Sequence, residues 1–230
     1  MTGQAPRFIY LHGFASSPGS TKAKAFRAWG ERHGISVDVL DLRVPSFEHL
    51  LFSAMEARVK EAIDAAGGAR ARAVLIGSSL GGLTAARVAE ADPRVCALFL
   101  MAPAFELASR WEARIGKQAW STWRTSGFLE VDDYASRQKA RVHWGFVDEL
   151  AQIDAARGAF SDVRVPTRIV HGTRDSVVDI ELSRAWSKGK RFVELVELDD
   201  GHELGASIPR ILEEADAFFG PFLGGSRRRG

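Results

Sequence analysis

The chain has 230 residues, of which 46% are hydrophobic and 10% aromatic, a composition typical of a well-packed globular protein and not of a fibrous or disordered one. Its 31 basic and 29 acidic residues give a formal net charge of +2, so charge alone favours neither nucleic acid nor a membrane as partner. The single cysteine, Cys96, excludes an intramolecular disulfide. Residues 1–7 lack the pattern of a secretory signal and no apolar stretch approaches transmembrane length, so we expect a cytoplasmic protein.

The first half of the chain alternates between predicted strands and predicted helices. In chain order these are a strand at 8–11, a helix at 22–32, a strand at 35–40, a helix at 46–66, a strand at 74–77, a helix at 80–91 and a strand at 95–101. The helix at 46–66 has apolar residues at helical spacing and ends at Gly67-Gly68. The strand at 95–101 is almost continuously apolar, as expected for a strand covered on both faces. The alternation predicts an α/β fold with a mostly parallel, doubly wound sheet.

This alternation stops after Pro103. Residues 104–165 contain four of the six tryptophans, which are Trp111, Trp120, Trp123 and Trp144. Helical spacing runs from 106 to 123, and residues 129–131 are expected to pair with 141–144 as a hairpin. We interpret 104–165 as a helical and hairpin insert that follows the strand ending near Met101. Its aromatic residues form either a satellite core or a cap that covers a substrate, and the two interpretations are compatible.

The alternation resumes in the last third of the chain. The predicted elements are a strand at 167–170, a helix at 180–188, a strand at 192–198 and a helix at 206–219 with Pro209 in its first turn. No repeat or linker is present, so we expect one domain over 1–230, with 104–165 as a cap-like insert. Residues 224–230, with three consecutive arginines, are expected to form a flexible, solvated tail.

A serine stands at the sharpest predicted corner of the chain. The stretch from Val74 to Leu83 reads Val-Leu-Ile-Gly-Ser-Ser-Leu-Gly-Gly-Leu, which predicts a strand, a tight turn and a helix. Ser79 lies between Gly77 and Gly81, the Gly-x-Ser-x-Gly spacing typical of a nucleophile at a strand-to-helix corner. The same spacing would also suit a glycine-rich turn with an ordinary serine, so other residues must decide.

Four of the predicted parallel strands end in polar or glycine-rich residues, and such ends share one edge of the sheet. They are followed by His12-Gly13, Gly77-Ser78-Ser79, Gly172 to Asp175 and Gly201-His202. A serine nucleophile needs an imidazole base, and the imidazole needs an acid that orients it. Only His202 among the six histidines follows Asp175, as the chain order serine, acid, histidine requires. The sequence therefore predicts a catalytic triad of Ser79, Asp175 and His202.

Other interpretations of these residues remain open. Asp175 could instead cap the helix that follows it, and His202 could be a surface loop histidine. Glu106 is an alternative acid, because it lies soon after the strand that ends at Met101. His171 and His12 are interpreted as structural residues, His12 as a brace for the loop that follows the first strand.

The transition state of acyl transfer also needs donors for its oxyanion. The backbone N–H groups of Phe14, in the loop after the first strand, and of Leu80, directly after Ser79, are the predicted donors. Trp111, Trp120, Trp123 and Trp144 are candidates for an apolar or aromatic substrate pocket. No metal site is expected, because the chain lacks His-Glu-x-x-His and cysteine pairs. No nucleotide site is expected either, because the glycines match neither a P-loop nor a dinucleotide-binding turn.

These motifs carry a family resemblance. Residues 10–23 read Tyr-Leu-His-Gly-Phe-Ala-Ser-Ser-Pro-Gly-Ser-Thr-Lys-Ala and are similar to the start of small bacterial YqiA-like esterases. Over nearly its whole length the chain resembles the α/β-hydrolase superfamily. The resemblance implies the α/β-hydrolase fold, with Ser79 as nucleophile, Asp175 as acid and His202 as base, and with Phe14 and Leu80 as oxyanion donors.

The functional hypothesis is a cofactor-independent serine hydrolase. It would cleave a small-molecule carboxylic ester or thioester of a small to medium acyl group through an acyl-enzyme on Ser79. Two alternatives stay open at this point. One is a protein of the same fold that binds a small ligand without turning it over, and the other is an acyltransferase or peptidase that uses the same triad.

Overall fold

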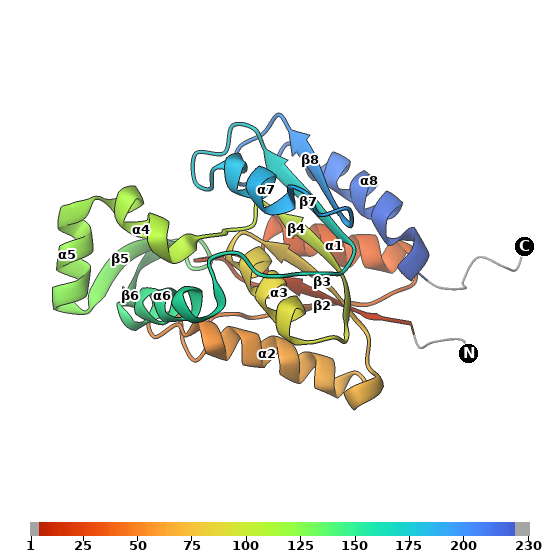
Figure 1. Ribbon diagram of the computed structural model, residues 1–230, viewed down its shortest axis with the longest axis horizontal. Coiled ribbons are helices and arrows are strands. Elements are labelled where there is room, and N and C mark those ends of the chain that lie inside the picture. The colour runs from red at the N-terminus through yellow and green to blue at the C-terminus, as the bar shows by residue number, and fades with distance from the viewer. Residues whose placement is uncertain (1–4, 224–230) are drawn as a thin grey trace, which may run out of the picture.

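The computed structural model describes residues 5–223, and its centre is a six-stranded parallel sheet (Figure 1). The strands are β1 (Arg7–Leu11), β2 (Val37–Leu40), β3 (Ala73–Ser78), β4 (Val95–Met101), β7 (Thr167–Gly172) and β8 (Val193–Leu198). Their order is β2-β1-β3-β4-β7-β8, and every neighbouring pair is parallel. The chain builds outward from β1 to β2 and then returns to place β3 on the other side of β1. Ligand sites form at such a switch point, outside the carboxyl ends of the strands.

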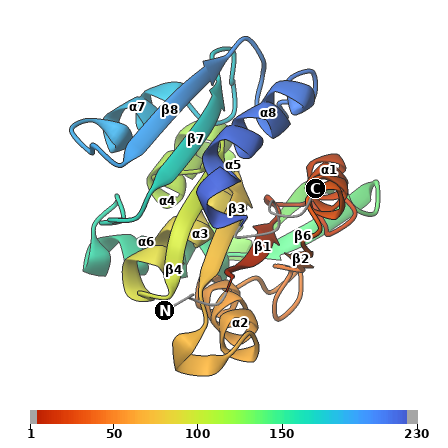
Figure 2. The same ribbon diagram turned by 90° about the vertical axis from the view of Figure 1, so that its right-hand side faces the viewer.

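Helices cover both faces of the sheet, which confirms the doubly wound arrangement (Figure 2). One face carries α1 (Thr21–Arg32) and α8 (Ile208–Phe219), and the other carries α2 (Phe52–Ala65), α3 (Leu80–Ala91) and α7 (Ile180–Ser187). Short 3-10 helices occupy Gly68–Arg70 and Gly220–Phe222. Side chains of β1 alternate between the faces: Phe8 packs edge-on against Phe219 of α8 at 5.2 Å between ring centroids, while Ile9 joins the core under α2 and α3.

The expected insert follows β4. It consists of α4 (Leu107–Ile115), α5 (Lys117–Ser126), an antiparallel hairpin of β5 (Phe128–Asp133) and β6 (Gln138–His143), and α6 (Gly145–Arg157). Figure 1 shows these elements together at the left, beyond one end of the sheet. The helix predicted over 106–123 is in fact two helices, which meet at Gly116, where φ is 86°. Helix α6 was not predicted, because its apolar residues do not gather on one stripe.

The predicted start of the helix at 46–66 is wrong. Leu51 is extended, with φ −131° and ψ 130°, and α2 begins only at Phe52. The carboxylate of Glu149, from α6, accepts hydrogen bonds from the backbone N–H groups of Phe52 at 2.5 Å and Ser53 at 3.3 Å. The helix is therefore capped by a residue far away in the sequence, and no local capping residue marks its first turn.

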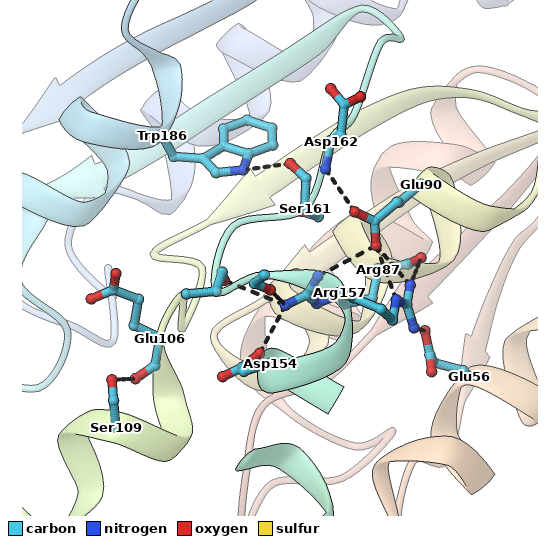
Figure 3. A network of polar contacts seen from close by, with 12 residues as sticks. Glu56, Arg87, Glu90, Glu106, Ser109, Asp154, Arg157, Ser161, Asp162 and Trp186 are labelled. Atoms are coloured by element: carbon cyan, nitrogen blue, oxygen red, sulfur yellow. Dashed lines mark hydrogen bonds and ion pairs between the residues drawn. The ribbon is translucent and has the colours of Figure 1, made fainter. Parts of the chain in front are cut away.

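A network of ion pairs fastens α6 to the helices beside the sheet (Figure 3). Arg87 of α3 is 1% exposed and donates to Asp154 at 2.8 Å and to the Gly158 carbonyl. Arg157 of α6 pairs with Glu90 of α3 and with Glu56 of α2, each at 2.8 Å. Because each of these arginines is held by carboxylates, neither is left as an uncompensated charge.

Two further expectations concern the C-terminal tail and membrane-spanning segments. The predicted tail at 224–230 lies outside the described residues. Within residues 5–223, no helix combines the length and the hydrophobicity that crossing a bilayer requires.

Candidate active site

Ser79 is the single residue between β3 and α3, and its backbone is strained. Its φ of 54° and ψ of −116° lie in a region that residues with a side chain rarely adopt. The glycines of the motif allow this corner: a Cβ at Gly77 would lie 2.4 Å from the Gly81 carbonyl oxygen, and a Cβ at Gly81 would lie 2.2 Å from that of Leu11. The Ser79 N–H donates to the Met101 carbonyl at 2.9 Å, which ties the corner to β4.

The structure brings together the three residues of the predicted triad. Ser79 Oγ lies 3.0 Å from His202 Nε2, and His202 Nδ1 lies 2.7 Å from Asp175 Oδ2. Asp175 follows β7 and His202 follows β8, and because β7 and β8 are neighbours their loops meet at one edge of the sheet. The three residues are far apart in the sequence, and sheet topology alone brings them into contact.

Asp175 has a side chain that is completely buried. Its Oδ1 accepts from the N–H groups of Val177 and Val178, each at 2.8 Å, so it also holds the turn before α7. The cap of α7 is Asp179, so the interpretation of Asp175 as a helix cap is wrong. Burial would raise the pKa of Asp175, but hydrogen bonds from His171, His202 and the Val178 N–H outweigh burial and hold its pKa below the ordinary value. The carboxylate is therefore ionised at neutral pH.

An ionised Asp175 determines the tautomer of His202. A carboxylate only accepts hydrogen bonds, so His202 Nδ1 carries the proton and donates it to Asp175 Oδ2. In the neutral ring Nε2 is then unprotonated and is positioned to accept the Ser79 hydroxyl hydrogen. This is the protonation state in which an imidazole can act as a general base towards a serine.

Glu106, the alternative acid, lies at the start of α4 in a left-handed conformation with φ 54°. Its backbone carbonyl accepts from Ser109 Oγ at 3.0 Å, and Figure 3 shows both residues beside the ion-pair network. Among residues 5–223, Glu106 makes no hydrogen bond to His202, whose Nδ1 is held by Asp175. The geometry therefore favours Asp175 over Glu106 as the partner of this imidazole.

His12 orients the peptide that carries the Phe14 N–H. The ring is buried, and its Nε2 accepts from the Leu42 N–H at 3.1 Å, while the exposed carboxylate of Asp41 lies farther away at 3.3 Å. Nδ1 is then the protonated nitrogen and donates to the Gly13 carbonyl at 2.9 Å. Because the C=O and N–H of a trans peptide point in opposite directions, the Phe14 N–H points away from His12.

The two predicted oxyanion donors are both without a backbone partner near Ser79. The Phe14 N–H makes no hydrogen bond to any other described residue. Leu80 is the first residue of α3, and the first N–H groups of a helix have no intrahelical acceptor. A Cβ at Gly13 would lie 3.3 Å from Ser79 Cβ, so the lack of a side chain there leaves space beside the nucleophile.

The Phe14 side chain connects this loop to the insert. Its ring packs edge-on against Trp111 at 5.3 Å between centroids and stacks on Phe146 at 6.1 Å, and it also contacts Phe47 at 5.6 Å. Trp111 and Phe146 belong to α4 and α6. The insert therefore packs directly against the residue that carries one of the predicted oxyanion donors.

The four tryptophans gather in the core of the insert. Trp123 is completely buried and its Nε1 donates to the Val142 carbonyl at 2.9 Å, and Trp111 is 6% exposed. Trp120 and Trp144 are partly exposed and lie 4.7 Å apart between centroids. This arrangement agrees with a satellite aromatic core, and only Trp111 contacts the loop beside Ser79. A substrate-binding role for the four stays a prediction.

One hollow on the surface of the protein is lined by residues other than those of the predicted triad. A surface hollow of about 400 Å³ between α2, α3 and α6 is lined in part by Glu56 and Arg157, which pair with each other. In the part of the chain from 5 to 223, no three His, Cys, Asp or Glu side chains are arranged to hold a metal ion.

Two residues near the triad were not predicted to take part in it. His171, interpreted as a structural residue, lies 3.2 Å from Asp175 Oδ2 through its Nε2. Lys22 of α1 donates to the carbonyl of Glu203 at 2.7 Å and so holds the loop that carries His202; burial lowers the pKa of Lys22. His171 and Asp175 are four residues apart, a spacing that does not predict contact outside a helix, and nothing in the sequence connects Lys22 with residue 203.

Comparison with solved structures identifies the fold. Ferulic acid-bound Est1E from Butyrivibrio proteoclasticus superimposes with a TM-score of 0.78 at 21% identity, covering 96% of this chain and 91% of that one. Alpha/beta hydrolase domain-containing protein 10 from mouse gives 0.75 at 20% identity, covering 96% and 92%. A monoacylglycerol lipase from Paleococcus ferrophilus gives 0.71 at 17% identity, covering 94% and 97%. These likenesses confirm the predicted α/β-hydrolase fold.

Comparison of sequences identifies the family. No curated protein sequence matches the chain significantly. The model of the family described as "Uncharacterised protein family (UPF0227)" matches residues 7–220, which span almost all of the described fold. The family model covers well over half of the chain, so the chain belongs to the UPF0227 family.

Proposed function

We propose that the protein is a serine hydrolase that cleaves a carboxylic ester or thioester of a small to medium acyl group. The observation that carries the proposal is the continuous hydrogen-bonded chain from Ser79 Oγ through His202 to Asp175, at 3.0 and 2.7 Å, on a serine with a strained backbone. Catalysis by such a chain depends on geometry and protonation, and both agree with a nucleophile, its base and an orienting acid.

The first half of the reaction forms an acyl-enzyme. As Ser79 Oγ attacks the carbonyl carbon, its proton passes to His202 Nε2 and a tetrahedral intermediate forms. The Phe14 and Leu80 N–H groups donate to the oxyanion. When the intermediate collapses, the bond to the leaving group breaks and His202 returns the proton to the departing alcohol or thiol.

The second half releases the acid. A water molecule attacks the acyl carbon, and His202 takes one of its protons as general base. Collapse of the second intermediate breaks the bond to Ser79 Oγ, which recovers its proton from His202. Asp175 stays ionised throughout and stabilises the imidazolium form of His202.

The surroundings of Ser79 support the proposed substrate class. The predicted oxyanion loop is packed against aromatic side chains of the insert, which suits an apolar or aromatic acyl group. The solved structure of Est1E contains ferulic acid, an aromatic acid, on the same fold. We therefore propose a small-molecule ester or thioester as the partner and treat 104–165 as a cap-like part of one domain.

A fluorophosphonate probe tests the proposal, because it reacts only with an activated serine. We expect one probe per chain, and mass spectrometry should locate it on Ser79. Ser79→Ala should remove labelling, while Ser78→Ala, a matched change in the neighbouring serine, should retain it. Absence of labelling in the wild-type protein, or equal labelling of Ser79→Ala, would contradict the proposal.

A further inference from the structure

Asp175 is held by two histidines. Its Oδ2 lies 2.7 Å from Nδ1 of His202 and 3.2 Å from Nε2 of His171. His171 precedes Asp175 by four residues, at the end of β7, and its ring is completely buried. Because no part of this ring is exposed, His171 cannot touch a substrate, and any effect it has on catalysis passes through Asp175.

The partners of His171 determine where its proton lies. Nε2 faces two acceptors, the Val178 carbonyl at 3.0 Å and the Asp175 carboxylate at 3.2 Å, so this nitrogen must carry a hydrogen. Nδ1 lies 2.7 Å from Ser183 Oγ, whose hydroxyl can donate to it. The Nε2–H group therefore donates to the Val178 carbonyl and lies beside Asp175 Oδ2, while a serine of α7 holds Nδ1.

The His171 N–H group lies beside the hydrogen bonds that hold Asp175. The Val177 and Val178 N–H groups donate to Oδ1, His202 donates to Oδ2, and Nε2 of His171 lies 3.2 Å from the same Oδ2. Without His171, rotation of the carboxylate out of line with His202 would be opposed at Oδ2 by His202 alone. A second donor at Oδ2 fixes the plane of the carboxylate and favours its ionised form in a fully buried position.

We propose that His171 is a positioning residue of the triad, which keeps Asp175 oriented towards His202 through the Nε2–H group that lies beside Oδ2. The inference rests on the proposed function, since it assigns the role through the triad acid. Ser183 supports it by holding Nδ1. The bond between Asp175 and His202 is thus set by a second, buried imidazole that never meets the substrate.

Two amide substitutions at position 171 separate the effect of the Nε2 hydrogen from the effect of filling the space of the ring. The amide nitrogen of Gln reaches the position of Nε2, whereas that of Asn reaches only the position of Nδ1. His171→Gln should keep kcat within a few-fold of wild type, and His171→Asn should lower kcat on the order of tenfold, with little change in KM. Ser183→Ala should have a smaller effect than His171→Asn, because Nε2 keeps both of its acceptors.

The outcomes distinguish this inference from the proposed function. If wild-type protein does not react with fluorophosphonate, the proposed function fails. If wild type reacts but Gln and Asn at position 171 give the same kcat, or Ser183→Ala is as impaired as His171→Asn, the positioning role is overturned. Thermal unfolding of each variant shows which of them are folded.

A measurement on the wild-type protein needs no variant at all. Nitrogen-15 NMR of the imidazole rings reports which ring nitrogen carries hydrogen. The inference requires a protonated Nε2 in His171 at the pH of the activity assay. An unprotonated Nε2 would overturn it even if His171→Asn does not fold.

Discussion

Changing Asp175 to Asn probes the proposed triad acid with almost no change in the shape of the side chain. The Asn side chain must place its NH2 group at one of the two carboxylate positions, and donors already occupy both. At Oδ1 it would meet the Val177 and Val178 N–H groups, each 2.8 Å from that position, which cannot change their protonation. The NH2 group is therefore expected at Oδ2, where it faces the ring nitrogens of His202 and His171.

His202 can accommodate that NH2 group only by moving its own hydrogen from Nδ1 to Nε2. Nε2, 3.0 Å from Ser79 Oγ, then cannot accept the serine proton. Serine hydrolases with this wrong tautomer lose about 10⁴-fold in kcat, which corresponds to about 5.4 kcal/mol of transition-state stabilisation. We expect a loss of that order for Asp175→Asn in hydrolysis of a p-nitrophenyl ester, with an unchanged fold by circular dichroism.

Glu106→Gln is the matched control for this experiment. It makes the same carboxylate-to-amide change at the alternative acid, which lies beside Ser109 (Figure 3), whereas the Nδ1 of His202 is held by Asp175. Its kcat should stay within a few-fold of wild type. If Asp175→Asn is nearly as active as wild type while Glu106→Gln is inactive, our reasoning about the acid is wrong.

Three further predictions concern stability and the insert. The pKa of Asp175 is below its ordinary value, so its ionised form stabilises the fold at any pH above the unfolded-state pKa of about 3.9. This stabilisation is lost as the pH falls below that value. The difference in unfolding free energy between wild type and Asp175→Ala should therefore shrink on acidification. Gly81→Ala should lower the free energy of unfolding in urea by about 1–3 kcal/mol or more, because its Cβ would lie 2.2 Å from a backbone oxygen. The control Gly220→Ala should be neutral or stabilising, because that position has open space and a helical φ. Trp111→Leu should lower kcat more than Trp120→Leu does, because only Trp111 packs on Phe14; a flat activity profile over p-nitrophenyl esters of increasing chain length would show that the tryptophans only pack.

The parts of the fold that were predicted correctly depend on short-range patterns. Apolar runs that end in glycine or polar residues located the strands, and the parallel arrangement then placed Ser79, Asp175 and His202 at one edge. The triad could be proposed from sequence because each residue lies in the loop that follows its own strand, Ser79 directly and Asp175 and His202 a few residues further on. Local spacing and topology together were sufficient for this prediction.

The features that sequence did not predict depend on contacts between distant segments. Helix α2 begins at Phe52 because Glu149 of α6 caps it, and no residue near position 52 carries that information. The contact of Lys22 with residue 203 likewise joins the first helix to a loop near the end of the chain. Such contacts become visible only when the packing of the elements is known.

His171 shows the same limit at closer range. It precedes Asp175 by four residues in the sequence, but outside a helix this spacing does not predict contact. The turn after β7, held by Asp175 Oδ1, brings the ring back to Oδ2. A structural role and a role in the triad could not be separated without that turn.

The central claim is that an acyl group passes through Ser79. Rapid quenching of the protein with a p-nitrophenyl ester, followed by mass spectrometry of its peptides, tests this most directly. We predict a transient mass increase, equal to the acyl group, on the peptide that contains Ser79. Ser79→Ala should show no such increase. In the His202→Ala variant, an acyl group introduced by an activated ester should last longer than in wild type. Ester turnover without any acylated peptide, or an adduct on another residue, would contradict the account.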